Sequence, residues 1–195
     1  MNLAALKVPA ATESRRDRLL AAASRLAELL RLEQLTPEIV AEAASVSEAD
    51  FIAEFGTVGD YMAIVHHDFM EMILNRLIQE TGQMRPGFER ILRASLLQLD
   101  ICLEVRALRS LITHARRQIP RVAEDLHKRN HATSLMISLE LKQLGCRQPL
   151  VIGRYWCQMV LEAAEIEAEA GGIVPEARQV LRDFLDLWSL ESSLH

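Results

Sequence analysis

Helix-start signals recur along this chain and constrain its fold more than any other feature. Residues 14–17 read Ser-Arg-Arg-Asp, residues 47–50 read Ser-Glu-Ala-Asp, and residues 57–60 read Thr-Val-Gly-Asp. A hydroxyl residue followed three positions later by an acid is the pattern of a capping box at a helix N-terminus. Thr36-Pro37 adds a fourth start, because threonine caps helices well and proline is favoured at the first helical position. The sequence therefore predicts an all-α fold.

The remaining boundaries follow from apolar residues at helical spacing and from glycine and proline breaks. A short linker is expected at residues 33–35, between the first two helices. We see no strand alternation and no internal repeat. The nine expected helices cover approximately residues 15–30, 37–44, 48–55, 58–79, 88–104, 107–116, 121–144, 150–170 and 176–190.

Composition narrows the class of protein. Half of the residues are hydrophobic, so a sizeable core is available, and the net charge of -5 by itself predicts no nucleic-acid partner. The three cysteines form no C-x-x-C pair, which indicates reduced thiols in a cytoplasmic protein. No apolar run approaches the roughly 20 residues of a membrane span. We also find no catalytic or cofactor motif, and we expect neither an enzyme nor a bound cofactor or metal.

The segment from Arg15 to about Leu74 resembles the N-terminal domain of the TetR family of transcriptional regulators. Within the family pattern, Ala41 lets two helices approach, Val46 fills the turn, and Phe55 anchors the third helix. Ser45 stands where the family usually has glycine, at a turn position that often needs a positive φ. The matching residues are Thr36, Val40, Ala41, Ala44, Val46, Ser47, Phe55 and Tyr61.

The resemblance implies a helix-turn-helix domain of DNA-binding type at residues 1–60 and a helical ligand-binding and dimerisation domain at residues 61–195. It implies a transcriptional regulator, a repressor, which binds operator DNA as a homodimer and responds to a small hydrophobic effector. The matching last two helices form the dimer interface in this family. We expect that interface at Tyr155, Ala163, Val180, Leu181, Phe184 and Trp188.

The third helix departs from the family on the surface that meets DNA. Glu48 replaces a common lysine, Asp50 a threonine, Ile52 a phosphate-touching tyrosine, and Glu54 a histidine or arginine. Carboxylates there would meet phosphates, so DNA binding is expected to be weak, with a shallow salt dependence. The candidate DNA-contacting residues are Arg15, Arg16, Thr36, Ser47, Glu48, Asp50, Ile52 and Glu54.

These substitutions leave a second hypothesis beside the DNA-binding regulator. In that hypothesis the protein keeps the fold, has lost or weakened DNA binding, and acts through protein or ligand contacts. A soft, Met-rich lining in the middle helices would suit a hydrophobic effector, although the same side chains also suit an ordinary core. The candidate pocket residues are Met70, Phe88, Leu92, Ser95, Cys102, His114, Trp156 and Met159.

Basic residues dominate between Arg106 and Arg147. They either attract an acidic protein or a phosphate-bearing ligand, or form a solvated face paired with acids of the N-terminal domain, and we favour the second interpretation. His127 and His131 have a spacing that can hold zinc, but no further ligand accompanies them, so we expect a metal-free surface pair. Of the adjacent His66 and His67, at most one can point inward.

Overall fold

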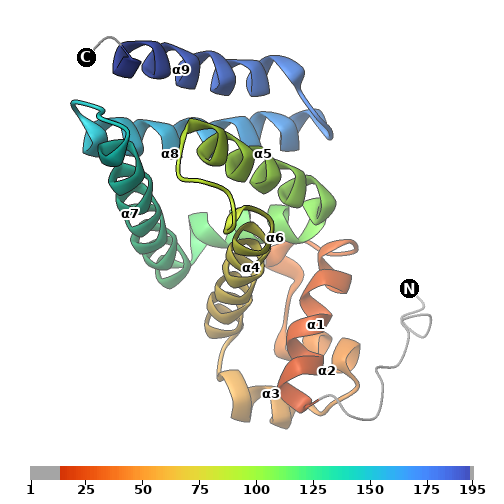
Figure 1. The fold of residues 1–195 in the computed structure, drawn as a ribbon. Coiled ribbons are helices and arrows are strands. Elements are labelled where there is room, and N and C mark those ends of the chain that lie inside the picture. Colours follow the sequence, from red (N-terminus) through yellow and green to blue (C-terminus); the bar gives the residue numbers. More distant parts are fainter. Residues whose placement is uncertain (1–13, 194–195) are drawn as a thin grey trace. The chain divides into compact units, whose positions relative to one another are not determined.

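The structure is a computed structural model that describes residues 14–193, with side chains described as far as residue 188. Within that range all of its regular secondary structure is helical, and the expected all-α fold is confirmed (Figure 1). Two local differences appear: the first helix ends at Ala27, and the expected linker forms a short 3-10 helix. The elements are α1 (Arg15–Ala27), η2 (Leu32–Gln34), α2 (Pro37–Ala44), α3 (Glu48–Phe55), α4 (Val58–Thr81), α5 (Phe88–Glu104), α6 (Arg106–Gln118), α7 (Pro120–Gln143), α8 (Pro149–Ala170) and α9 (Pro175–Ser193).

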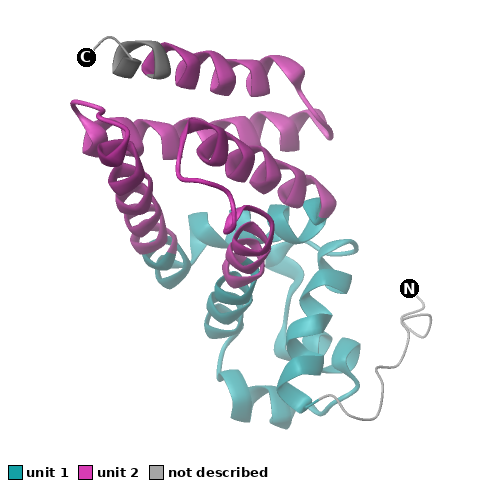
Figure 2. Cartoon of the chain, in the orientation of Figure 1, with its two compact units in different colours: residues 1–69, 105–125 teal, residues 70–104, 126–195 magenta. Residues whose placement is uncertain are grey.

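Packing separates the chain into two compact units, each built from two stretches of sequence (Figure 2). Unit 1 contains the chain up to residue 69 and residues 105–125, and unit 2 contains residues 70–104 and 126–195. This division differs from the expected one at residue 60, because the first half of α4 and all of α6 pack with the N-terminal helices. The assignment of DNA binding and ligand binding to residues 1–60 and 61–195 stays a prediction.

The helix ends follow from local side-chain chemistry. The Ser14 and Ser47 hydroxyls accept from the backbone N–H of Asp17 and Asp50, 3.1 Å away in both cases. Each of these acids accepts in return from the backbone N–H of its serine, which closes the predicted capping boxes. Thr36 caps α2 in the same way, with its hydroxyl oxygen 3.3 Å from the N–H of Ile39.

An aromatic cluster holds α3 and α4 in the core of unit 1. The Phe51 ring lies 5.5 Å from that of Phe55 and 5.4 Å from that of Tyr61. The buried Tyr61 hydroxyl donates to the carbonyl of Leu19 in α1 at 2.8 Å, so its polar group is satisfied. Burial raises the pKa of this phenol, which stays neutral. The expected anchoring role of Phe55 is confirmed.

The core of unit 2 lies among α5, α8 and α9. Trp156 on α8 is buried, and its indole N–H donates to Ser95 Oγ on α5 at 3.0 Å. Arg178 on α9 donates to the buried carboxylate of Glu167 on α8 and to Asp100 on α5, which joins the three helices. The hydrogen bonds to these two carboxylates raise the pKa of Arg178 further.

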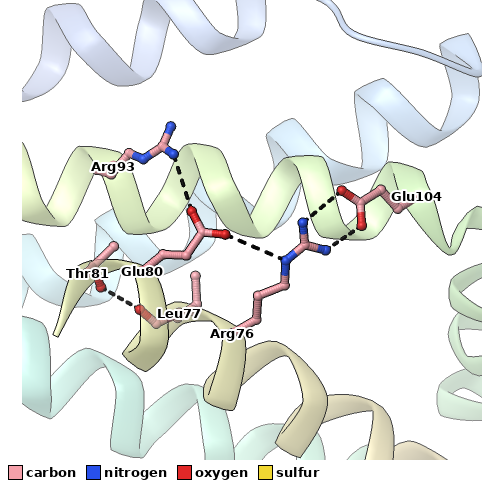
Figure 3. Close-up of polar contacts among 6 residues, drawn as sticks. All are labelled: Arg76, Leu77, Glu80, Thr81, Arg93 and Glu104. Atoms are coloured by element: carbon pink, nitrogen blue, oxygen red, sulfur yellow. Dashed lines mark hydrogen bonds and ion pairs between the residues drawn. The ribbon is translucent and has the colours of Figure 1, made fainter.

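A second group of ion pairs fastens the C-terminal half of α4 to α5 (Figure 3). The Arg76 guanidinium donates to both carboxylate oxygens of Glu104, and Glu80 accepts from Arg93 at 3.4 Å. The hydrogen bond from Arg76 lowers the pKa of Glu104. Near the end of α4, the Thr81 hydroxyl donates to the carbonyl of Leu77 at 2.7 Å.

The turn between α2 and α3 carries a backbone constraint. Ser45 has φ 56° and ψ 47°, and it is the non-glycine residue with positive φ in the described part of the chain. The N–H of Val46 donates to the carbonyl of Ala41 at 3.0 Å, which closes the turn around Ser45. The expectation that this position requires a left-handed backbone is therefore confirmed.

Ser45→Gly is expected to raise the free energy of unfolding by up to about 1 kcal/mol, because glycine enters the left-handed region without a Cβ penalty. Ser45→Ala is the matched control, since it removes the hydroxyl but keeps the Cβ. Urea unfolding followed by circular dichroism measures both. A glycine variant no more stable than the alanine variant would show that the turn stores no such strain.

Candidate nucleic-acid interface

The helix α3 presents four stripes, each made of two residues four positions apart. Phe51 and Phe55 form the buried stripe that holds the helix in unit 1. The opposite stripe is Ala49 and Ala53, and both are exposed. The two flanking stripes pair Asp50 with Glu54 and Glu48 with Ile52. This arrangement decides which of the candidate residues face solvent.

Asp50 and Glu54 point toward α1 and do not stand alone on the surface. Arg15 Nη1 lies 2.7 Å from Asp50 Oδ1, and Arg16 Nη1 lies 2.6 Å from Glu54 Oε1. Hydrogen bonds from Ser47 lower the pKa of Asp50, with a smaller contribution from the charge of Arg15. From the sequence these two acids were expected to meet phosphates, and the structure pairs each of them with a cation. The cations come from α1.

The two arginines keep part of their surface open. The Arg15 side chain is 56% exposed and that of Arg16 is 44% exposed. The Arg16 guanidinium also lies 5.4 Å from the centre of the Phe55 ring. Because a guanidinium has five N–H donors, one carboxylate leaves donors for a second acceptor. The acids of α3 therefore position two arginines at the edge of its exposed face.

Ile52 is the large apolar side chain of that face, and it is 50% exposed. Glu48, four residues earlier, is also exposed, and no ion pair involves it within the described residues. The Thr36 and Ser47 hydroxyls, both predicted to contact DNA, accept the cap hydrogen bonds of α2 and α3. All eight candidate DNA-contacting residues lie in unit 1.

The sequence around α3 is strongly acidic. Between Arg31 and His66 the chain contains no Lys, Arg or His. Positive charge reaches this surface from α1, where Arg18 and Arg25 donate to the carbonyls of Ser45 and Ala43 at 3.2 and 2.8 Å. The sequence does not reveal that Arg25 binds the end of α2, because its partner there is a backbone carbonyl. The acids in this stretch are Glu33, Glu38, Glu42, Glu48, Asp50, Glu54 and Asp60.

Contacts around α4, α6 and α7 favour the second interpretation of the basic region, a face with internal partners. In unit 1, Arg121 pairs with Asp60, and Gln118 donates to Glu33 at 2.7 Å. In unit 2, Arg129 Nη1 lies 2.9 Å from Glu71 Oε1. No phosphate or acidic protein is required to satisfy these groups.

The four histidines considered above are placed as follows. His66 is fully buried, with Nδ1 2.9 Å from an Asp125 carboxylate oxygen, whereas His67 is exposed, as expected for adjacent helical residues. His127 and His131 are both exposed on α7. Across the described residues, no three His, Cys, Asp or Glu side chains are grouped as a metal site.

The expected pocket residues are mostly packed together. Trp156 belongs to the core of unit 2, and Phe88, Leu92 and Met159 pack against that core. Ser95 and Cys102 are buried, and Met70 is partly buried in the same unit. His114 lies apart from them, exposed on α6 in unit 1. Their assignment to a ligand pocket stays a prediction, and Met159 lines a cavity at α8 and α9.

That cavity is a groove along α8 and α9 in unit 2 that is open to solvent, and it has a volume of about 330 Å³. The predicted pocket residues lie on α4, α5, α6 and α8, whereas this cavity is lined from α8 and α9. Sequence analysis assigned several of its lining residues to a dimer interface. The lining residues are Gln148, Val151, Ile152, Tyr155, Met159, Phe184 and Trp188.

The expected dimer residues divide into an exposed and a buried set. Tyr155 and Val180 are exposed, and Phe184 and Trp188 are partly buried. Ala163 and Leu181 are buried within the chain, so they serve the core of unit 2 and are not accessible to a partner. The helical spacing of the apolar residues predicted a stripe along these helices. It did not show which residues of the stripe pack inside the chain and which are exposed.

Solved structures of other proteins share the fold of this chain, although its sequence is only distantly similar to theirs. The sequence matches no protein-family model and no curated protein. Among solved structures, a transcriptional regulator from Rhodococcus sp. Rha1 matches with a TM-score of 0.69 and 16% identity, over 90% of this chain and 96% of that one. A protein from Saccharomonospora viridis, assigned as a transcriptional regulator and crystallised with choline, has a TM-score of 0.73 and 16% identity, over 88% and 95%.

A TetR transcriptional regulator from Rhodococcus sp. RHA1 matches with a TM-score of 0.57 and 17% identity, over 92% of this chain and 97% of that one. None of the helices described in the structure combines the length and hydropathy that a membrane span requires. Identities this low establish the fold alone. The chain has the fold of TetR-type transcriptional regulators, as its N-terminal residues predicted.

Proposed function

We propose that this protein is a TetR-type transcriptional regulator, a repressor that binds operator DNA as a homodimer. The observation that supports it most is the exposed face of α3, carried on a capped helix-turn-helix and bordered by two half-exposed arginines. Asp50 and Glu54 are paired with those arginines, so two of the three acids of α3 are neutralised and Glu48 is left as its unpaired acid among the described residues. Arg15 and Arg16 are the proposed phosphate contacts.

A second candidate function is regulation through protein contacts. The absence of Lys, Arg and His between Arg31 and His66, together with seven acids, supports it. Glu38, Glu42 and Glu48 are exposed on α2 and α3 and would repel phosphates. A basic protein surface would suit these acids better than DNA.

Selection from a random duplex library at about 50 mM salt separates the two functions. A DNA-binding regulator is expected to enrich one sequence, with two similar half-sites because a dimer reads both. Ala53→Glu places a carboxylate on the exposed face of α3 and should abolish the enrichment. Ala168→Glu, which adds the same charge at an exposed position of α8, should leave it unchanged.

Absence of any enriched sequence for the wild-type protein would reject DNA regulation and leave the protein-contact function. Equal enrichment by wild type and Ala53→Glu would show that DNA is bound elsewhere on the chain. Circular dichroism of both variants checks that they remain folded.

The exposed apolar side chains of α8 and α9 support the homodimer. Val180 and Leu187 lie seven residues apart on one stripe of α9, and Leu187 is 68% exposed. Tyr155 and Val151 add exposed apolar surface on α8. A second copy would cover these side chains, as the partner does in a dimer with two-fold symmetry.

Val180→Glu combined with Leu187→Glu is expected to give a monomer at micromolar concentration, because the charges would be buried in the interface. Met136→Glu is the control, since Met136 is 64% exposed but lies on α7. Sedimentation velocity distinguishes the two states. A wild-type monomer, or a double variant that still forms dimers, would exclude this interface.

We propose that a small hydrophobic effector binds the cavity between α8 and α9, where Val151 and Tyr155 are both lining residues and interface residues, so that the second copy of the homodimer would close over the bound effector. Its volume of about 330 Å³ lies near the lower end of ligand sites, roughly 300–1,000 Å³. Tyr155, Phe184 and Trp188 line it, and such rings also suit a quaternary ammonium head group, the class of the choline held by the Saccharomonospora viridis protein. The helix α4 continues from unit 1 into unit 2. An effector controls DNA binding only if α4 has two arrangements and the effector binds one of them more tightly than the other.

A further inference from the structure

We propose that the exposed face of α3 recognises thymine methyl groups in the major groove, with Ile52, which stands in place of the family's phosphate-contacting tyrosine, as the main contact. The inference rests on the proposed DNA binding and names the base chemistry that this chain selects. It depends on the side chains of three exposed residues, Ala49, Ile52 and Ala53.

The shape of this face suits a close approach to the groove floor. Ala49 and Ala53 have only a methyl side chain, so the helix backbone can come near the base edges. Ile52 projects beside them and is 50% exposed, while Phe51 and Phe55 on the opposite side fix the rotation of the helix. The orientation of Ile52 is therefore set by buried aromatic contacts.

The chemistry of this face excludes the usual base contacts. Ala49, Ile52 and Ala53 carry no side-chain donor or acceptor, so they cannot form the paired hydrogen bonds by which Arg, Asn or Gln recognise guanine and adenine. The apolar group on a major-groove base edge is the C5 methyl of thymine. Placing Ile52 against the polar edge of another base would remove water without replacing its hydrogen bonds. Thymine is consequently the base that this face favours.

Cations lie along one border of the face and an acid lies along the other. Arg15 and Arg16 lie along its α1 side, held by Asp50 and Glu54, and their exposed donors suit phosphates. On the other border, Glu48 can accept a hydrogen bond from the amino group of cytosine. An apolar centre with cations along one edge matches a groove floor bearing methyl groups beside a phosphate backbone.

The test uses the duplex enriched by library selection, prepared with deoxyuridine in place of thymidine, one position at a time. This replacement keeps base pairing and phosphate charge and removes only the methyl group. The wild-type protein is expected to lose roughly three- to fivefold in affinity for each methyl that Ile52 contacts. Ile52→Ala should bind both duplexes with nearly equal affinity, because its shorter side chain no longer reaches the methyl.

Ile78→Ala is the matched control, since Ile78 is 56% exposed on α4 in unit 2 and should leave the discrimination intact. Equal wild-type affinity for the thymidine and deoxyuridine duplexes would overturn the inference while the DNA-binding function stands. Unchanged discrimination by Ile52→Ala would also overturn it. If selection yields no duplex, the inference is rejected together with the proposed function.

Discussion

The ion pairs between α1 and α3 are the contacts on which this account depends. They join Arg15 to Asp50 and Arg16 to Glu54 at the edge of the helix-turn-helix. Without them, α3 would present unpaired carboxylates to any polyanion. With them, Asp50 and Glu54 are neutralised and orient two guanidiniums, and the exposed face of α3 is left with Ala49, Ile52 and Ala53 beside Glu48. The same four side chains therefore determine both the charge and the chemistry of the candidate interface.

Features set by neighbouring residues could be predicted from the sequence. The capping boxes begin at Ser14 and Ser47, and the left-handed backbone occurs at Ser45, because each depends on a few adjacent positions. The pairing of Arg16 with Glu54 joins residues 38 positions apart in the chain. The sequence indicated Arg15 and Arg16 as candidate DNA contacts but did not show that they pair with the acids of α3, and for that reason both acids were expected against DNA.

The roles of the apolar residues in the middle of the chain were harder to predict. The sequence alone does not tell whether an apolar side chain packs in a core or lines a cavity. Trp156 satisfies its indole N–H with Ser95 inside unit 2, which makes it a core residue. Met159 lines the cavity between α8 and α9 instead. Ala163 and Leu181 share the helical stripe of the expected interface but face inward. Only three-dimensional packing separates these roles.

The salt dependence of DNA binding tests the central claim most directly, because it counts the phosphates that cations neutralise. If Arg15 and Arg16 supply the phosphate contacts, a dimer makes four of them. A plot of the logarithm of the binding constant against the logarithm of the salt concentration should then have a slope of about −3.6. A slope steeper than about −5 would require further cations on the interface and would contradict the account.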